Sequence, residues 1–162
     1  MKLFNMQKSK NIYITCTNQA MFDFYPSGSK CCVFGTYKVN LELSIDELFN
    51  NLHSKHRNVI RKAEKDGIII EHGKDYRDIC IKNIIETHER QGLNINTSQF
   101  DNLNNLNKNV EYFIAKDIEN NIHSSAIYFW NENHTCYYMY GGSSLKHHTG
   151  ALICCNGEQW LK

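Results

Sequence analysis

The chain has 162 residues, of which 41% are hydrophobic and 22% charged, a composition that excludes wholesale disorder and fits one domain or one lobe of a larger protein. Its 18 Lys and Arg residues nearly balance 17 Asp and Glu residues, so a polyanionic partner has to be argued from local charge clustering. No apolar run approaches the roughly 18 residues of a membrane span. Residues 1–10 carry lysines without an apolar stretch after them, so we expect no secretory signal and a cytoplasmic location.

The seven cysteines and eight histidines show no spacing typical of a zinc site, and no C-x-x-C pair occurs. Without an export signal, we expect the cysteines to be reduced thiols. The sequence therefore predicts no metal and no bound cofactor.

The clearest element in the first half of the chain is a helix. Ser44 and Glu47 form a capping-box signature, and Gly67 is a natural stop, so the pattern predicts one helix over 44–67. Its apolar stripe also contains His56, which we expect to be packed and not catalytic. The stripe consists of Ile45, Leu48, Phe49, Leu52, Val59, Ile60 and Ala63.

The other elements are read from apolar periodicity and turn residues. Short strands are expected at 11–15 and 32–39, and a further strand at 68–71. Gly141 and Gly142 are expected to end the last strand. The remaining predictions are helices at 75–91 and from residue 97 or 98, antiparallel strands at 110–117, 122–130 and 135–140, and a helix at 149–162.

This order predicts an α+β (mixed α/β) fold with a central mixed, mostly antiparallel sheet flanked by helices. A helix that follows such strands normally returns the chain to the sheet. Because no strand follows 149–162, we expect the sheet to be incomplete at the C-terminus and the chain to be a lobe of a larger protein. The unpaired edge would favour a homo-oligomer.

A cationic face on the helix 44–67 is the strongest signal of function. Arg57, Arg61 and Lys65 are four residues apart and form one ridge, with Lys62 beside it. Like charges at that spacing cost a few tenths of a kcal/mol per pair. Such a ridge is suited to a phosphate or an RNA backbone. The alternative interpretation is a solvated face that keeps the protein soluble.

Three further residues are candidates for substrate binding. Arg90 is suited to a bidentate contact with a diphosphate, although a helix-end cation that complements the helix dipole is the alternative. Tyr138 and Tyr140 are expected to share one face of their strand because side chains alternate, so both hydroxyls could line a cleft. Packed sheet aromatics are the alternative there. No catalytic residue is assigned.

Several segments together carry a resemblance to a known family. They are residues 34–41, 44–48 and 55–67, then Thr87-x-x-Arg90-x-Gly92, then the Tyr-Tyr-Met-Tyr-Gly-Gly-Ser run at 137–143. In combination they resemble the Fem family of peptidoglycan interpeptide-bridge aminoacyltransferases. The most specific part consists of His56, Arg57, Ile60, Arg61, Lys62 and Ala63. The resemblance covers roughly residue 34 to the C-terminus.

The resemblance implies a GNAT-like fold, with 1–33 as a separate N-terminal segment and 34–162 as the truncated second lobe of a two-lobed enzyme. It also implies a bacterial, cytoplasmic transferase of cell-wall synthesis. Such an enzyme moves an amino acid from aminoacyl-tRNA onto an amino group of a UDP- or lipid-linked muropeptide precursor. The substrate-binding residues would be Arg57, Arg61, Lys62, Arg90, Tyr138 and Tyr140.

Two other functions remain open. An acetyl-CoA-dependent GNAT N-acyltransferase would use a glycine-rich loop at a helix start, whose N–H groups bind the pyrophosphate. Here that place holds His147, His148, Thr149, Gly150 and Ala151, with one suitable glycine, and the two histidines are expected to be exposed. A truncated lobe that binds RNA or a partner without turnover is the second alternative.

Overall fold

The computed structural model describes residues 38–104, 109–130, 135–151 and 154. The chain divides into two units, Met1–Asn40 and Leu41–Lys162, and every element described below belongs to the second. The strand predicted at 11–15 lies outside the described residues, as does the strand at 32–39 except for its last two residues. The helix predicted at 149–162 also lies outside them, apart from residues 149–151 and 154.

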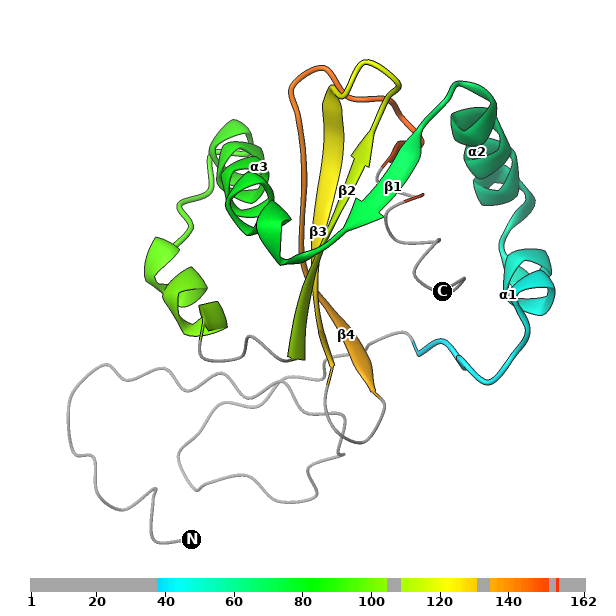
Figure 1. Cartoon of the computed structure of the whole chain (residues 1–162), viewed down its shortest axis with the longest axis horizontal. Helices are drawn as coiled ribbons and strands as arrows, with labels where there is room; N and C mark the ends of the chain where they lie inside the picture. The colour runs from blue at the N-terminus through cyan, green and yellow to red at the C-terminus, as the bar shows by residue number, and fades with distance from the viewer. Residues whose placement is uncertain (1–37, 105–108, 131–134, 152–153, 155–162) are drawn as a thin grey trace, which may run out of the picture. The chain divides into compact units, whose positions relative to one another are not determined.

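The described strands form one antiparallel sheet in the order β1-β2-β3-β4. They are β1 (Ile69–His72), β2 (Val110–Lys116), β3 (Ile122–Trp130) and β4 (Cys136–Ser143). A turn with Asn120 at φ 65° joins β2 to β3, in which the Asp117 carboxylate accepts hydrogen bonds from the backbone N–H groups of Glu119 and Asn121, both at 2.9 Å. Helices flank this sheet, so the predicted α+β class is confirmed (Figure 1).

Helices cover both faces of the sheet. On one face, Ile60 and Ala63 of α2 (Ser54–Lys65) pack with Ala115 and Ala126 in a cluster that we call the α2-side cluster. On the other face, Cys80 and Ile84 of α3 (Arg77–Arg90) pack with the neighbouring residues Ile114 and Ile127. Because successive strand residues point to opposite faces, β2 and β3 have to be apolar at consecutive positions. Figure 1 shows α2 and α3 on opposite sides of the strands.

The helix predicted over 44–67 is wrong in one respect, because it is two helices, α1 (Ile45–Asn51) and α2. Leu52 and His53 are extended, with ψ of 146° and 142°. Leu52 packs against the α2-side cluster, and His53 Nδ1 caps α2 by accepting a hydrogen bond from the Lys55 N–H at 3.2 Å. The apolar stripe keeps its helical period across this break, so periodicity alone did not reveal it.

The element predicted from residue 97 or 98 is the 3₁₀ helix η3 (Thr97–Asn104), and a second 3₁₀ turn, η2 (Lys74–Tyr76), precedes α3. The Asn96 side chain accepts a hydrogen bond from the Ser98 N–H at 3.1 Å near the start of η3. Phe100 and Leu103 are buried, as their spacing predicted. A tighter helix keeps both on one side, where they belong to the same buried cluster as Cys80 and Ile84 of α3.

The expectation that Gly141 and Gly142 end the last strand is wrong, because β4 continues to Ser143. The reason is the contact between α3 and β4. A Cβ at Gly142 would lie 2.6 Å from the carbonyl carbon and oxygen of Asn83 and from the backbone nitrogen of Ile84. Glycine is therefore used here for close approach between backbones and not for a turn.

We predict that Gly142→Ala destabilises the chain by about 2–3 kcal/mol, because its Cβ would meet helix backbone that cannot move aside. Gly92→Ala is the matched control. Its Cβ would meet nothing within 4 Å, and its cost of about 1 kcal/mol comes from the left-handed conformation at φ 68°. Urea unfolding of both variants measures the difference. Equal losses of unfolding free energy in the two variants would show that the α3 backbone does not closely contact β4 at Gly142.

Candidate functional site

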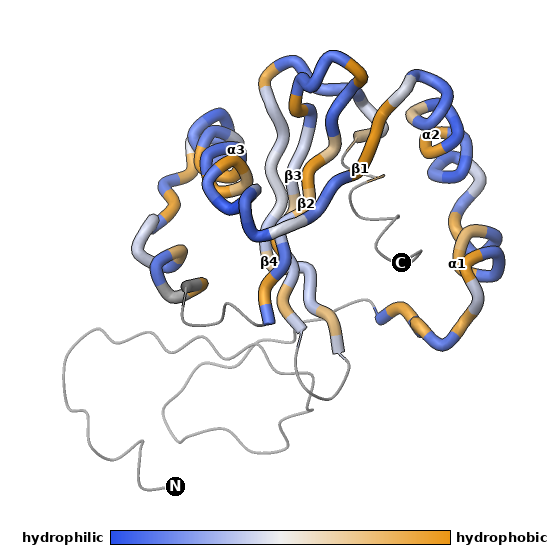
Figure 2. Tube along the Cα trace, viewed as in Figure 1, coloured by the Kyte–Doolittle hydropathy of each residue, from blue (hydrophilic) through white to orange (hydrophobic). Residues whose placement is uncertain are grey.

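The solvent side of α2 carries a dense set of cations. Their side chains are exposed, whereas Ile60 and Ala63 on the other side of the helix are buried. The exposed cations are Lys55, Arg61, Lys62 and Lys65, and we call them the α2 cationic face. Figure 2 shows α2 as mostly hydrophilic, in contrast to the hydrophobic start of β1. This surface suits a polyanion.

Arg61 is held in place by an aromatic ring of the preceding helix. Its guanidinium carbon lies 5.2 Å from the centroid of the Phe49 ring, in a cation–π contact. Phe49 itself packs against the α2-side cluster. The stacking leaves the planar guanidinium at the surface with its conformational freedom reduced, which favours contacts to phosphate oxygens.

The Arg57 side chain contacts the end of α1, unlike the exposed cations of α2. Its Nη1 donates hydrogen bonds to the carbonyl oxygens of Asn50, at 2.9 Å, and of Leu52. These carbonyls lie at the C-terminal end of α1, where a cation also complements the helix dipole. Arg57 therefore joins α1 to α2, and its proposed role in substrate binding stays a prediction.

Arg90 also makes contacts within the chain. It donates to Thr87 Oγ1 at 3.1 Å and to the carbonyl oxygen of Ser143, the last residue of β4. Thr87 Oγ1 in turn accepts a hydrogen bond from the Ser143 N–H at 2.9 Å. Arg90 thus ties the end of α3 to the end of β4, while its side chain remains exposed.

The prediction that Tyr138 and Tyr140 share a face is wrong, because a β-bulge separates them. In the β3–β4 register Tyr138 pairs with Tyr128 and Tyr140 with Ile127, so Met139 is the extra residue. The Tyr138 ring lies 5.3 Å from that of Tyr128, in the α2-side cluster.

Tyr140 belongs to the opposite face of the sheet. Its hydroxyl donates to Gln99 Oε1 at 2.8 Å, and its ring packs edge-on to Phe100 at 5.3 Å. Burial raises the pKa of Tyr140 above its usual value, with the neighbouring Tyr137 as a smaller cause. Its hydroxyl is therefore a neutral donor that is already engaged.

The six predicted site residues do not lie together in one site. The structure brings Arg57, Arg61 and Lys62 together on α2, and Tyr138 lies on the same face of the sheet as that helix. Arg90 and Tyr140 belong to α3 and to the side that α3 covers. His56 is exposed, so the expectation that it is packed is wrong.

The sequence analysis missed a set of histidine–aspartate contacts at one end of the sheet. His148 Nε2 lies 2.9 Å from Asp66 Oδ2 at the end of α2, and His123 Nε2 lies 3.2 Å from Asp117 Oδ2. The expectation of an exposed pair holds for His147 and is wrong for His148, whose side chain is 19% exposed. No local spacing rule connects residues 66 and 148, so only the tertiary structure reveals the pair.

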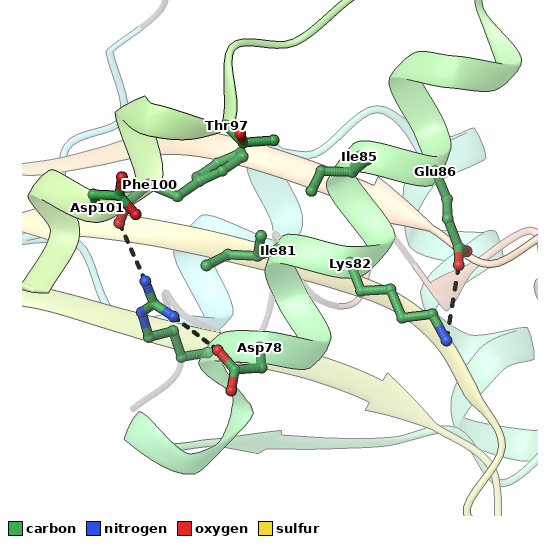
Figure 3. Close-up of a pocket in the computed structure, with 9 residues that line it drawn as sticks. Asp78, Ile81, Lys82, Ile85, Glu86, Thr97, Phe100 and Asp101 are labelled. Carbon is green, nitrogen blue, oxygen red and sulfur yellow. Dashed lines mark hydrogen bonds and ion pairs between the residues drawn. The ribbon is translucent and has the colours of Figure 1, made fainter.

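A shallow depression of about 440 Å³ lies between α3 and η3. Figure 3 shows the side chains of Ile81 and Ile85 from α3 and of Phe100 from η3 among its lining residues, together with the Lys82–Glu86 ion pair at 3.9 Å on α3. Its other lining residues are Arg77, Asp78, Thr97 and Asp101. None of the six predicted site residues lines it, and its charges have both signs, so we assign no ligand to it.

Two classes of feature are not found within the described parts of the chain. No group of three His, Cys, Asp or Glu side chains there is placed to hold a metal ion. No helix among those residues is both long and apolar enough to cross a membrane.

We predict that Arg57→Ala lowers the free energy of unfolding by about 1–2 kcal/mol, because the C-terminal carbonyls of α1 lose a charged donor. Lys62→Ala on the same helix is the control, and a change within about 0.5 kcal/mol is expected for this exposed side chain. Urea denaturation gives both values. A loss at Lys62 as large as that at Arg57 would contradict the capping role.

Comparison with known proteins adds one result to this geometry. No family model matches the chain, and no curated protein matches it in sequence. Among solved structures, the crystal structure of FemX matches with a TM-score of 0.61 at 15% sequence identity, over 75% of this chain and 47% of the FemX chain. The chain thus spans about half the length of that protein. This match confirms that the described sheet and helices have the Fem-like fold that the sequence resemblance implies.

Proposed function

We propose that this chain is one lobe of a Fem-like aminoacyltransferase of the bacterial cytoplasm. The enzyme would transfer an amino acid from aminoacyl-tRNA onto an amino group of a UDP- or lipid-linked muropeptide precursor. The observation that carries the proposal is the α2 cationic face on a FemX-like fold. Arg61 of that face stacks on the Phe49 ring.

The chemistry of this transfer requires positioning more than covalent help. The acceptor amine attacks the ester carbonyl, the C–N bond forms, and the ribose hydroxyl of the tRNA leaves with a proton that comes from the amine. Holding the two large anionic substrates in register is therefore the main task of the protein. Cations on a rigid helix suit that task because their spacing is fixed.

The structure disfavours acetyl-CoA as the acyl donor. The candidate pyrophosphate loop has its N–H groups engaged within the chain: that of His148 donates to His123 Nδ1 at 3.0 Å, and that of Gly150 to His148 Nδ1 at 3.1 Å. The Ala151 N–H donates to the His148 carbonyl oxygen at 3.0 Å. A pyrophosphate would have to replace these bonds, whereas a coenzyme A site needs such donors to be available.

A ligand titration tests the proposed function directly. Thermal unfolding of the chain is followed with tRNA, a UDP-linked muropeptide and coenzyme A, each alone. A ligand present at about 100 times its Kd stabilises the folded state by about 2.7 kcal/mol. Stabilisation by tRNA and by the muropeptide supports the transferase. A response to coenzyme A alone contradicts it, and a response to tRNA alone favours an RNA-binding lobe without turnover.

We also predict that Lys62→Glu weakens tRNA binding and lowers the slope of log affinity against log salt by about 1, because one phosphate contact is lost. Lys82→Glu is the matched control: it makes the same charge change on α3, where the Lys82 side chain is 76% exposed. Filter binding between 50 and 200 mM salt, in steps of about 50 mM, measures both slopes. Equal effects of the two variants would mean that the α2 cationic face is a solubilising surface.

A further inference from the structure

Two histidines at one end of the sheet have both ring nitrogens engaged. His123 Nδ1 accepts a hydrogen bond from the His148 N–H at 3.0 Å, and His148 Nδ1 accepts one from the Gly150 N–H at 3.1 Å. The Nε2 atoms contact the carboxylates of Asp117 and Asp66. Because a backbone N–H can only donate, each Nδ1 must carry a lone pair. Both rings are therefore neutral, with the proton on Nε2 and donated to the carboxylate.

These contacts hold the loop 144–150 to two other parts of the structure. His123 lies at the start of β3 and Asp66 follows α2, so the two rings connect the loop to both elements. The Ser144 N–H donates to the His123 carbonyl oxygen at 3.0 Å and strengthens the attachment. The contacts that use Nδ1 of the two rings depend on the protonation state of that atom.

The end of the loop and two described residues after it, Ala151 and Cys154, pack against the α2 side of the sheet. A Cβ at Gly150 would lie 2.9 Å from the Ala63 Cβ and 3.1 Å from Val59 Cγ1. Ala151 and Cys154 are buried in the α2-side cluster. Release of the loop would uncover the inner side of the helix that carries the α2 cationic face.

We propose that His123 and His148 form a proton-operated latch, in which the neutral rings hold the loop 144–150 closed against α2 and protonation at Nδ1 releases it. Protonation converts Nδ1 from an acceptor into a donor that faces another donor. The N–H groups of His148 and Gly150 then lose their partners at the same time. This proposal rests on contacts within the chain and is independent of the proposed enzymatic function.

A competing effect has to be weighed. Protonation also strengthens the attraction of each ring to its carboxylate, which opposes release. Each carboxylate already receives the Nε2 proton, so only charge attraction is added. Solvent weakens this attraction more at Asp66, whose side chain is 40% exposed, than at Asp117, whose side chain is 23% exposed. The two partly buried N–H groups would meanwhile lack an acceptor, which is the larger cost.

Other charged and titratable groups lie on the same elements and are part of this balance. Hydrogen bonds from the Asn121 side chain and backbone, with a smaller one from His123, hold the pKa of Asp117 at about 2, so this carboxylate stays ionised. Lys116 is paired with Glu71 at 2.7 Å. The other groups are Lys65 next to Asp66, Glu119 in the β2–β3 turn, and Lys146 and His147 in the loop.

The sign of the pH dependence follows from proton uptake. The open loop binds a proton on each freed imidazole, whereas the closed loop binds none at Nδ1, so acid favours opening. As the pH falls below the range in which a free imidazole protonates, the equilibrium constant for loop opening should increase. The increase is about tenfold for each unit of pH decrease and for each proton taken up. Above that range the latch should not respond to pH.

Hydrogen exchange of the whole chain between about pH 8 and 5.5, the range around which imidazoles titrate, tests the latch. We expect the protection factors of the His148 and Gly150 amides to fall at least tenfold across this range, while the amide of Ala126 in β3 keeps its protection. Unchanged protection of the loop amides would overturn the proposal. Parallel loss at Ala126 would do so too, because it would mean global unfolding.

Three histidine variants test whether the imidazoles of His123 and His148 cause the pH dependence of loop protection. His123→Asn and His148→Asn keep an acceptor near the Nδ1 position but do not titrate, so the pH dependence of loop protection should flatten. His147→Asn is the matched control, since His147 Nδ1 faces the Ser144 carbonyl oxygen at 2.9 Å and must already donate. This variant should keep the pH dependence. An effect of His147→Asn equal to that of His148→Asn would contradict the assignment.

A measurement on the unmodified protein tests the same assignment even if the variants do not fold. Long-range proton–nitrogen NMR spectra at about pH 8, above the imidazole titration range, report the tautomer of each ring. We expect the Nε2–H form for His123 and His148 and the Nδ1–H form for His147. A proton on Nδ1 of His148 or of His123 at this pH would rule out the latch.

Discussion

The burial of both faces of β2 and β3 is the constraint on which the rest of the structure depends. Ile114 and Ala115, and likewise Ala126 and Ile127, are adjacent residues that are almost fully buried on opposite faces. Burying each of the larger side chains stabilises the chain by about 2–3 kcal/mol, so neither face can be left to water. Two helical layers are therefore required. This requirement places the α2 cationic face and Arg90 on opposite sides of the sheet.

Close backbone approach and one extra residue determine how β4 presents its aromatic side chains. Gly142 allows the α3 backbone to lie directly on the strand, and Met139 turns Tyr138 and Tyr140 to opposite faces. Tyr140 is consequently engaged with Gln99 and Phe100. Tyr138 is 41% exposed on the α2 side of the sheet, next to the buried Tyr128.

Arginines that a sequence motif assigns to substrate can equally be required for folding. Arg57 closes the end of α1, and Arg90 ties α3 to β4, whereas Arg61 stacks on Phe49 and remains at the surface. The set of exposed cations on α2 is therefore smaller than the motif implies, and Arg61 belongs to it. A guanidinium serves different physical ends in the two settings, because its five donors in one plane can satisfy carbonyl groups as well as phosphates.

The sequence by itself determined the α+β class, the antiparallel order of the last three described strands and the start of the first helix, because period, turn residues and capping residues are local signals. It also grouped Arg61, Lys62 and Lys65 on one cationic face, but the four-residue spacing placed Arg57 with them, and Arg57 is engaged with α1. The break at Leu52 and His53, the bulge at Met139 and the contact of His148 with Asp66 were decided only by tertiary structure. Each depends on what a residue meets across the fold, and no spacing along the chain encodes that partner.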